Sequence, residues 1–218
     1  MTFLDMQNAV KQGVLRNDLS YDQFINSALR EIQQRRSWSF MRTRQTITLP
    51  AGQTSVALPS NFKELQNVRP CIMLAIPDPS IPGAPVLKPV DVTYEQDETR
   101  RVWNWSASAP SIRVFIQDEE DPVTFAPIKT INIAIAVLED MPFVVRYYRF
   151  LPDLVNDTDT SPFIDNYPEM VELKAKVKAF NRINDPAAGT AEQIFGEQFA
   201  LASRQDAYKD VSGKENRM

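Results

Sequence analysis

The chain contains 218 residues, 43% of them hydrophobic and 24% charged, and carries a formal net charge of −4. These values are ordinary for a globular protein with a buried core, and the mild acidity argues against nucleic-acid binding over the whole surface. With no histidine and a single cysteine, the sequence excludes histidine-dependent catalytic triads, histidine-ligated metal sites and an internal disulfide. Its six glycines form no phosphate-binding motif, so we expect no nucleotide cofactor.

No segment of the sequence predicts export or membrane insertion. The first six residues contain an aspartate and no basic residue, unlike the start of a signal peptide. The longest apolar run, Ile133 to Leu138, is far too short to span a bilayer. We therefore expect cytosolic synthesis and no contact with a membrane.

The first forty residues predict two helices. The first is indicated by apolar residues at helical spacing, which are Phe3, Met6, Val10 and Val14. The second is predicted from Tyr21 to Ser37, because Ser20 and Gln23 form a capping-box pattern in front of an apolar stripe.

A basic segment follows at the end of the second predicted helix. Its arginines are Arg30, Arg35, Arg36, Arg42 and Arg44. One interpretation is a patch for phosphate or for an acidic partner surface. The other is a solvated helix end, which the helix dipole favours and which most charge runs turn out to be. Trp38 and Phe40, inside this segment, are expected in the core.

Between residues 45 and 150 the hydrophobic period changes to two, which predicts strands. Alternating runs at 45–49 and 55–58, separated by turn residues, predict a hairpin. Residues 59–65 predict a short helical turn, and the proline-rich residues 77–89 predict a loop or an extended segment. Further strands are predicted at 68–76, 92–94, 102–105, 112–116, 131–138 and 143–150.

The stretch after residue 150 contains three aspartates at short spacing. The side chains of Asp153, Asp157 and Asp159 carry the oxygens that calcium prefers. However, the stretch lacks the glycine and the final glutamate of a calcium-binding loop. We therefore interpret these residues as turn-forming and helix-capping, and we predict no metal site.

Two more helices are predicted after this stretch, one beginning at Pro168 and one running from about Ala187 to Lys209. The predicted fold class is α+β: a four-helix bundle formed by the N- and C-terminal helices, with an inserted antiparallel β-rich subdomain that is sandwich- or barrel-like. The predicted boundaries are 1–41 for the N-terminal helices, 42–152 for the β-rich subdomain, 153–210 for the C-terminal helices and 211–218 for a flexible tail.

Several blocks of the sequence match a recognisable pattern. Residues 147–154 read Y-x-R-x-L-P-x-L, and residues 158–169 lead into a helix start that reads Tyr-Pro-Glu. Residues 28–41 supply an early helix, and residues 47–64 supply an early pair of alternating runs. Together these blocks resemble the tailed-phage head–tail adaptor (connector) family, whereas residues 77–138 show no family pattern.

This resemblance implies a virion structural protein, similar to the podovirus tail tubular protein A type. Such adaptors form dodecameric rings beneath the portal protein, contact tail or nozzle proteins, and let DNA pass through the lumen without sequence-specific binding. The resemblance also implies no enzymatic activity, no cofactor, and a place in the neck or tail of the virion after synthesis in the host cytoplasm.

The adaptor hypothesis assigns roles to two sets of residues. The expected interface residues are Arg35, Arg36, Phe199, Tyr208 and Lys209, with the last three at the portal contact. The expected joint between the two subdomains consists of Leu151, Pro152, Asp153, Tyr167 and Pro168.

Two other classes of function stay open. Trp103 and Trp105 lie two residues apart on a predicted strand, which is typical of a packed sheet face or of a sugar-stacking platform. The second interpretation would make the protein a carbohydrate- or receptor-binding tail module. A glycosidase would need two carboxylates, for which the candidates are Asp97, Glu98, Asp118 and Glu119.

Overall fold

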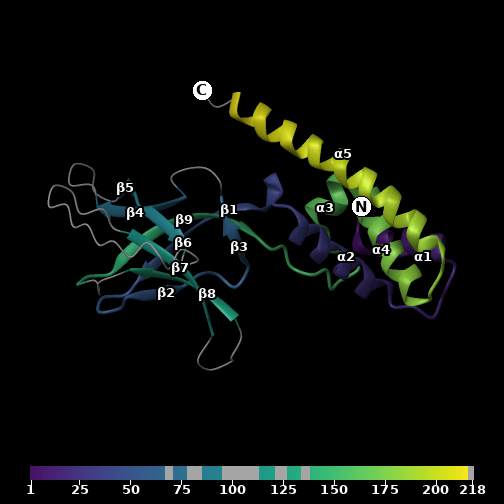
Figure 1. Cartoon of the computed structure of the whole chain (residues 1–218), viewed down its shortest axis with the longest axis horizontal. Helices are drawn as coiled ribbons and strands as arrows, with labels where there is room; N and C mark the ends of the chain where they lie inside the picture. Colours follow the sequence, from purple (N-terminus) through teal and green to yellow (C-terminus); the bar gives the residue numbers. More distant parts are fainter. Residues whose placement is uncertain (67–70, 78–84, 95–112, 121–126, 134–137, 216–218) are drawn as a thin grey trace. The chain divides into compact units, whose positions relative to one another are not determined.

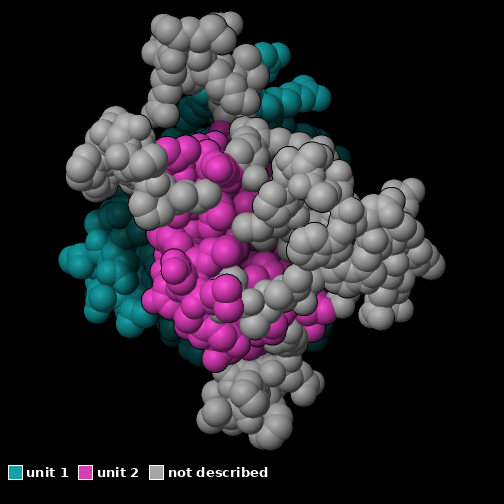
Figure 2. All heavy atoms as spheres, turned by 90° about the vertical axis from the view of Figure 1, so that its left-hand side faces the viewer, with its two compact units in different colours: residues 1–41, 150–218 teal, residues 42–149 magenta. Residues whose placement is uncertain are grey.

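The computed structural model describes residues 1–66, 71–77, 85–94, 113–120, 127–133 and 138–215. The chain forms two compact units (Figures 1 and 2). The helical unit combines Met1–Met41 with Phe150–Met218, and the strand unit consists of Arg42–Arg149. Both ends of the chain therefore belong to the helical unit, and the strand unit is an insertion between them.

The helical unit is built around one central helix, α4 (Pro168–Arg182). The other elements of this unit are α1 (Phe3–Val14), α2 (Tyr21–Arg35), the short 3-10 helix η1 (Ser39–Met41), α3 (Pro162–Asn166) and α5 (Ala187–Glu215). Helix α4 contacts α1, α2, α3 and α5. Its buried side chains, such as Val171, Ala175 and Val177, supply the apolar surface against which these neighbours pack.

Local sequence signals explain several helix ends. Thr2 and Asp5 form a reciprocal capping box at the start of α1, which satisfies two backbone N–H groups. Pro168 occupies the first turn of α4, as predicted. Ser20 is the N-cap of α2, but its side chain makes no capping hydrogen bond to any residue that the structure describes, so the predicted capping box is wrong there.

Helix α5 begins at Ala187, as predicted, and continues to Glu215. Residues 211–215, which the sequence analysis assigns to a flexible tail, are part of this helix. A helix interior requires only backbone hydrogen bonds, so these polar residues can extend α5 without an apolar face.

The strand unit contains two sheets that share one core. The first sheet has the order β1-β9-β4-β5 with β3 also pairing with β9, and consists of β1 (Arg42–Leu49), β9 (Met141–Arg149), β4 (Ile72–Pro77), β5 (Pro85–Pro89) and β3 (Phe62–Leu65). The second has the order β2-β8-β7-β6 and consists of β2 (Ser55–Ala57), β8 (Pro127–Ile133), β7 (Arg113–Glu120) and β6 (Asp91–Tyr94). Leu49, Ile72 and Phe143 of the first sheet pack in one cluster with Val114 and Ile131 of the second.

The pairing of β1 and β2 differs from the predicted hairpin. β1 pairs with β9 and β2 pairs with β8, so the turn after Leu49 carries the chain from one sheet to the other. Ile47 and Leu49 still face the same core against which Val56 packs. The alternation of apolar residues was therefore informative about the buried face but not about the strand partner, because both sheets supply that face.

The sheet topology corrects two further expectations and decides a third. Residues 62–65 form a strand that pairs with the end of β9, not a helical turn. Residues 85–89, predicted as a loop or an extended segment, form the strand β5 at the edge of its sheet, where proline is tolerated because no outward N–H is needed. The β6–β7 pair is parallel, whereas the other described pairs are antiparallel.

Truncating the central core residue of the strand unit should destabilise that unit. Phe143 is fully buried between the sheets, so Phe143→Ala is expected to lower the free energy of unfolding of the strand unit by about 3–5 kcal/mol. Hydrogen exchange measured by mass spectrometry should show faster exchange in β1 and β4 and unchanged exchange in α2 and α4. Val86→Ala, at an exposed position of β5, is the control and should change stability by less than about 1 kcal/mol. Equal loss of protection in α2 and α4 would contradict separate unfolding of the two units.

Candidate functional site

The segment that re-enters the helical unit after β9 is held on α2 by polar contacts. The backbone N–H of Leu151 donates to Gln33 Oε1 at 2.6 Å. Asn26 binds Leu154 twice, because its Nδ2 donates to the Leu154 carbonyl and its Oδ1 accepts from the Leu154 N–H, both at 2.9 Å. The Arg30 guanidinium pairs with the Asp153 carboxylate. Two side chains of α2, Gln33 and Asn26, thus supply hydrogen bonds that an irregular backbone needs, and Arg30 adds an ion pair.

The next turn of this segment contacts the start of α1. The N–H groups of Phe3 and Leu4 donate to the carbonyls of Asp159 and Asp157, at 2.9 and 3.1 Å. The Asp159 carboxylate accepts the N–H groups of Asn156 and Val155, which lowers the pKa of Asp159. These contacts make the turn that the sequence predicts. Among the described residues there is no group of three or more acidic or cysteine side chains able to hold a metal ion.

The centre of the helical unit is an aromatic cluster around Trp38, whose side chain is fully buried. The Trp38 ring centroid lies 5.2 Å from that of Tyr167, 5.5 Å from that of Phe163 and 5.7 Å from that of Phe199. Phe40 stacks on Trp38 at 6.0 Å. We call these five residues the Trp38 cluster. Because its members come from the segment after α2 and from α3, the α4 cap and α5, the cluster fastens the N-terminal part of the chain to the C-terminal helices.

A buried carboxylate lies beside this cluster. Asp206 of α5 is 3% exposed and accepts hydrogen bonds from the Ser39 N–H and hydroxyl. Arg36 approaches Asp206 to 3.7 Å, and its guanidinium lies 5.5 Å from the centre of the Trp38 ring. Burial and the Asp206 charge raise the pKa of the Tyr167 hydroxyl. The Arg36 guanidinium therefore neutralises the buried Asp206 carboxylate.

A second charged cluster joins α2, α4 and α5. Lys174 of α4 is 4% exposed, and its Nζ lies 2.9 Å from Glu31 of α2 and 2.8 Å from Glu192 of α5. Arg35 bridges the same two carboxylates at 2.6 and 3.3 Å, and Lys178 reaches Glu31 at 2.5 Å. These residues line an open cleft of about 440 Å³. The basic and acidic side chains of this cluster therefore neutralise most of one another's charge.

The predicted interface residues occupy different environments. Arg35 and Arg36 are engaged in the ion pairs just described. The ring of Phe199 is half-buried in the Trp38 cluster. Lys209 is exposed, donates to Asn166 Oδ1 at 3.2 Å and lies over the Tyr167 ring. Tyr208 is 77% exposed and is the residue of this set whose apolar surface is open to a partner.

The comparison with known proteins now adds to this geometry. The model of the SU10 adaptor protein family matches residues 1–217. The chain belongs to the SU10 adaptor protein family. No curated protein matches the sequence. The family membership makes the chain a phage adaptor, a structural component of the virion that interacts with other head–tail proteins, and it supports the resemblance seen in the sequence.

The five residues expected to form a joint all belong to the helical unit of this adaptor. Leu151 and Asp153 are docked on α2, and Pro152 between them is exposed. Tyr167 lies in the Trp38 cluster, and Pro168 starts α4. Residues 150–152, which the sequence analysis places in the β-rich part, thus cluster with the helices because Gln33 and Asn26 hold the segment there.

Sequence reasoning missed the polar residues that carry these contacts, namely Asn26, Gln33, Lys174, Glu192 and Asp206. A weak signal was present. Lys174 and Asp206 occur at helical positions in phase with apolar residues, which places a charge on a buried face. A charge in that position must be paired, but the partner lies on another helix and has no fixed sequence spacing.

The alternative sites lie mainly outside the described residues. Trp103, Trp105, Asp97 and Glu98 are not among them. Asp118 is exposed on β7 and pairs with Lys129 at 2.6 Å. No helix among the described residues is long and apolar enough to cross a membrane.

Removing the double contact of Asn26 should loosen the re-entering segment. Asn26→Leu deletes a donor and an acceptor and leaves the Leu154 backbone groups without these partners, at a cost of about 1–3 kcal/mol. Thermal or urea unfolding measures the loss, and hydrogen exchange of the Leu154 amide should accelerate. Gln34→Leu, at an exposed position of the same helix, is the control. Wild-type stability of Asn26→Leu would show that the contact contributes nothing.

The Glu31 cluster predicts a specific acid sensitivity. Burial alone would raise the pKa of Glu31, but hydrogen bonds from Lys174, Lys178 and Arg35 outweigh it and lower this pKa from 4.5 to about 2. A lowered folded-state pKa stabilises the fold above pH 4.5, and this stabilisation is lost as the pH falls towards 2. We expect Glu31→Gln to remove on the order of 2–3 kcal/mol near neutral pH and much less at pH 3.

Urea unfolding followed by circular dichroism between pH 6 and pH 3 measures this dependence. The control is Asp22→Asn, an exposed position in the first turn of α2. A difference between wild type and Glu31→Gln that stays constant across this pH range would refute the role of the cluster.

Proposed function

We propose that the chain is a subunit of a ring that lies beneath the portal and joins the phage head to the tail, with DNA passing through the lumen. The observation that carries the proposal is the match of the SU10 adaptor family over residues 1–217. In line with the resemblance seen in the sequence, we further propose that the ring is a dodecamer and that its arrangement is like that of the podovirus tail tubular protein A type. Ring contacts of this kind are heterologous, so one face of each subunit meets a different face of the next.

The architecture supports a mechanical role. Contacts of α1 with α2, of α4 with α1 and α2, and of α5 with α4 are those that a four-helix bundle would use, and we propose that these helices act as such a bundle. The strand unit has a core of its own. In ion pairs such as Lys174–Glu192 and Arg36–Asp206, buried charged groups hold helices together. We therefore propose that the chain is not an enzyme and works without a cofactor.

The surface charge supports passage of DNA without tight binding. Affinity for DNA comes chiefly from Lys and Arg that neutralise phosphates. The chain has 24 basic and 28 acidic residues, and many basic side chains of the helical unit are already paired. A lumen built from such subunits would hold DNA weakly, as a conduit requires.

We propose that the C-terminal part of α5 contacts the portal and that tail or nozzle proteins bind elsewhere on the ring. Tyr208 and Lys209 follow the last described buried residue of α5, Asp206, and both are exposed. Tyrosine is enriched at protein interfaces and among the residues that contribute most to binding, so the exposed Tyr208 supports a contact surface here. Arg35 and Arg36 are engaged internally, so their contribution to a partner surface would be indirect.

Co-assembly with portal rings tests this proposal. Purified chain mixed with portal rings should add a second ring, seen by electron microscopy. Tyr208→Ala combined with Lys209→Glu should reduce the bound fraction about tenfold or more, because an interface tyrosine often contributes over 1–2 kcal/mol. Val155→Ala, an exposed apolar position on the re-entering segment, is the matched control and should assemble normally.

A wild-type chain that binds neither portal nor tail rings would overturn the proposal. Binding to glycans that is lost in Trp103→Ala with Trp105→Ala would instead support a carbohydrate-binding module. The double variant at Tyr208 and Lys209 should retain its helical circular dichroism spectrum, so that lost assembly is separated from lost folding.

A further inference from the structure

Helix α5 carries a stripe of exposed apolar side chains on its outer face. Ile194, Leu201 and Tyr208 are 41%, 48% and 77% exposed, and each follows the previous one by seven residues. Seven residues make two helical turns less about 20°, so the three side chains lie on one face. We call them the α5 stripe.

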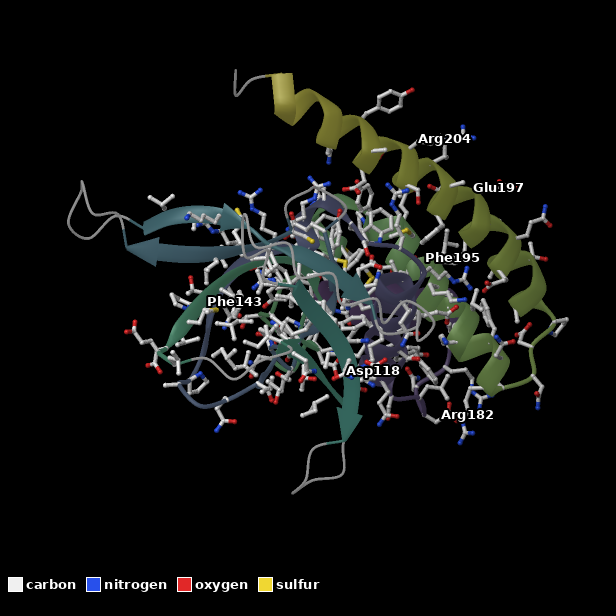
Figure 3. The ribbon with its side chains drawn as sticks, turned by 60° about the vertical axis from the view of Figure 1, so that its left-hand side comes forward. Asp118, Phe143, Arg182, Phe195, Glu197 and Arg204 are labelled. Atoms are coloured by element: carbon white, nitrogen blue, oxygen red, sulfur yellow. The ribbon has the colours of Figure 1, made fainter. Side chains whose placement is uncertain are left out.

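The α5 stripe is separate from the face that α5 uses inside the helical unit. Among residues 187–209 of α5, whose side chains the structure describes, the buried ones are Ala191, Phe195, Ala202 and Asp206. On a helical wheel these centre about 120° away from Leu201. Figure 3 shows Phe195 on the side of α5 that faces the other helices, and Glu197 and Arg204 on the outer side. The stripe is thus not needed to hold α5 in its own chain.

The polar residues beside the stripe are arranged symmetrically about Leu201. Glu197 lies four residues before Leu201 and Arg204 lies three residues after it, and both are exposed on the same flank. Gln198 and Gln205 take the equivalent places on the other flank. If two copies of α5 lie antiparallel with Leu201 at the centre, Ile194 of each faces Tyr208 of the other. In the same arrangement, Glu197 of each lies beside Arg204 of the other.

Glu197 and Arg204 of the two copies can pair only when the two α5 helices run antiparallel. Two parallel helices related by a two-fold axis place the flank with Glu197 and Arg204 beside the glutamine flank of the other copy, so no opposite charges would pair. The antiparallel pairing instead forms two equivalent Glu197–Arg204 pairs, one on each side of the two-fold axis. Charge complementarity therefore identifies the partner of this face as a second copy of the same helix.

We propose that the free chain forms a two-fold dimer through antiparallel contact of its α5 stripes. The span from Ile194 to Tyr208 is about 21 Å, so the contact is small and the dimer is weak, with dissociation in the micromolar range. The inference goes beyond the proposed function, because a closed two-fold contact differs from the heterologous contacts of a ring. Since the dimer would cover Tyr208, it must separate before this residue meets another partner.

Sedimentation of the purified chain between about 1 and 100 µM tests the dimer. The weight-average mass should rise from 24.8 kDa towards twice that value. Glu197→Arg alone and Arg204→Glu alone should each weaken dimerisation about tenfold, since each places like charges in both pairs. The double variant restores opposite charges and should dimerise like the wild type. A mixture of the two single variants should form mainly heterodimers.

Disulfide trapping tests the position of the two-fold axis. In a Cys71→Ser background, Leu201→Cys should give a crosslinked dimer on oxidation, because the two thiols meet at the axis. Ala207→Cys, exposed on the same helix but away from the stripe, is the matched control and should crosslink far less. A monomer at all concentrations, or a double charge variant that does not recover, would overturn the inference. Neither result bears on assembly with portal rings, so the two proposals fail separately.

Discussion

The helical unit depends on the burial of Trp38. Its ring contacts Phe163, Tyr167 and Phe199, which lie more than 120 residues further along the chain. Burial of a ring of this size contributes several kcal/mol, and edge-to-face contacts add to it. Because the cluster joins both ends of the chain, the strand unit between them can be an insertion with its own core.

The polar contacts around this cluster give the unit its specificity. Buried ion pairs such as Lys174–Glu192 add little net stability over apolar packing, but a misplaced helix would leave their charges unpaired. Hydrogen bonds of the re-entering backbone with the side chains of Asn26 and Gln33 fix the path of that backbone in the same way. These contacts pair several charged side chains inside the helical unit, whereas Ile194, Leu201 and Tyr208 of α5 are exposed. This division suits an adaptor of the SU10 family, whose role is to join other proteins.

The sequence was most informative where a local period or cap decides the structure. The apolar spacing of Phe3 to Val14 and the proline at 168 located helices correctly, because helix hydrogen bonds are local. Alternation at Ile47 and Leu49 identified the buried face of a strand. It did not identify β9 as the partner, because strand pairing joins residues about one hundred positions apart and leaves no local trace.

By itself, the sequence determined the α+β class, the lack of histidine chemistry and the likeness to phage adaptors, since composition, period and motif are properties of the chain alone. Only the tertiary structure decided with which residues Arg35 and Arg36 pair. Arg35 and Arg36 look like a surface patch in the sequence, yet Glu192 and Asp206 of α5 pair with them. It also decided that Leu201 lies outside, because a helix with apolar residues on two faces does not show which face is covered. Burial depends on what packs nearby, and distant segments supply those neighbours.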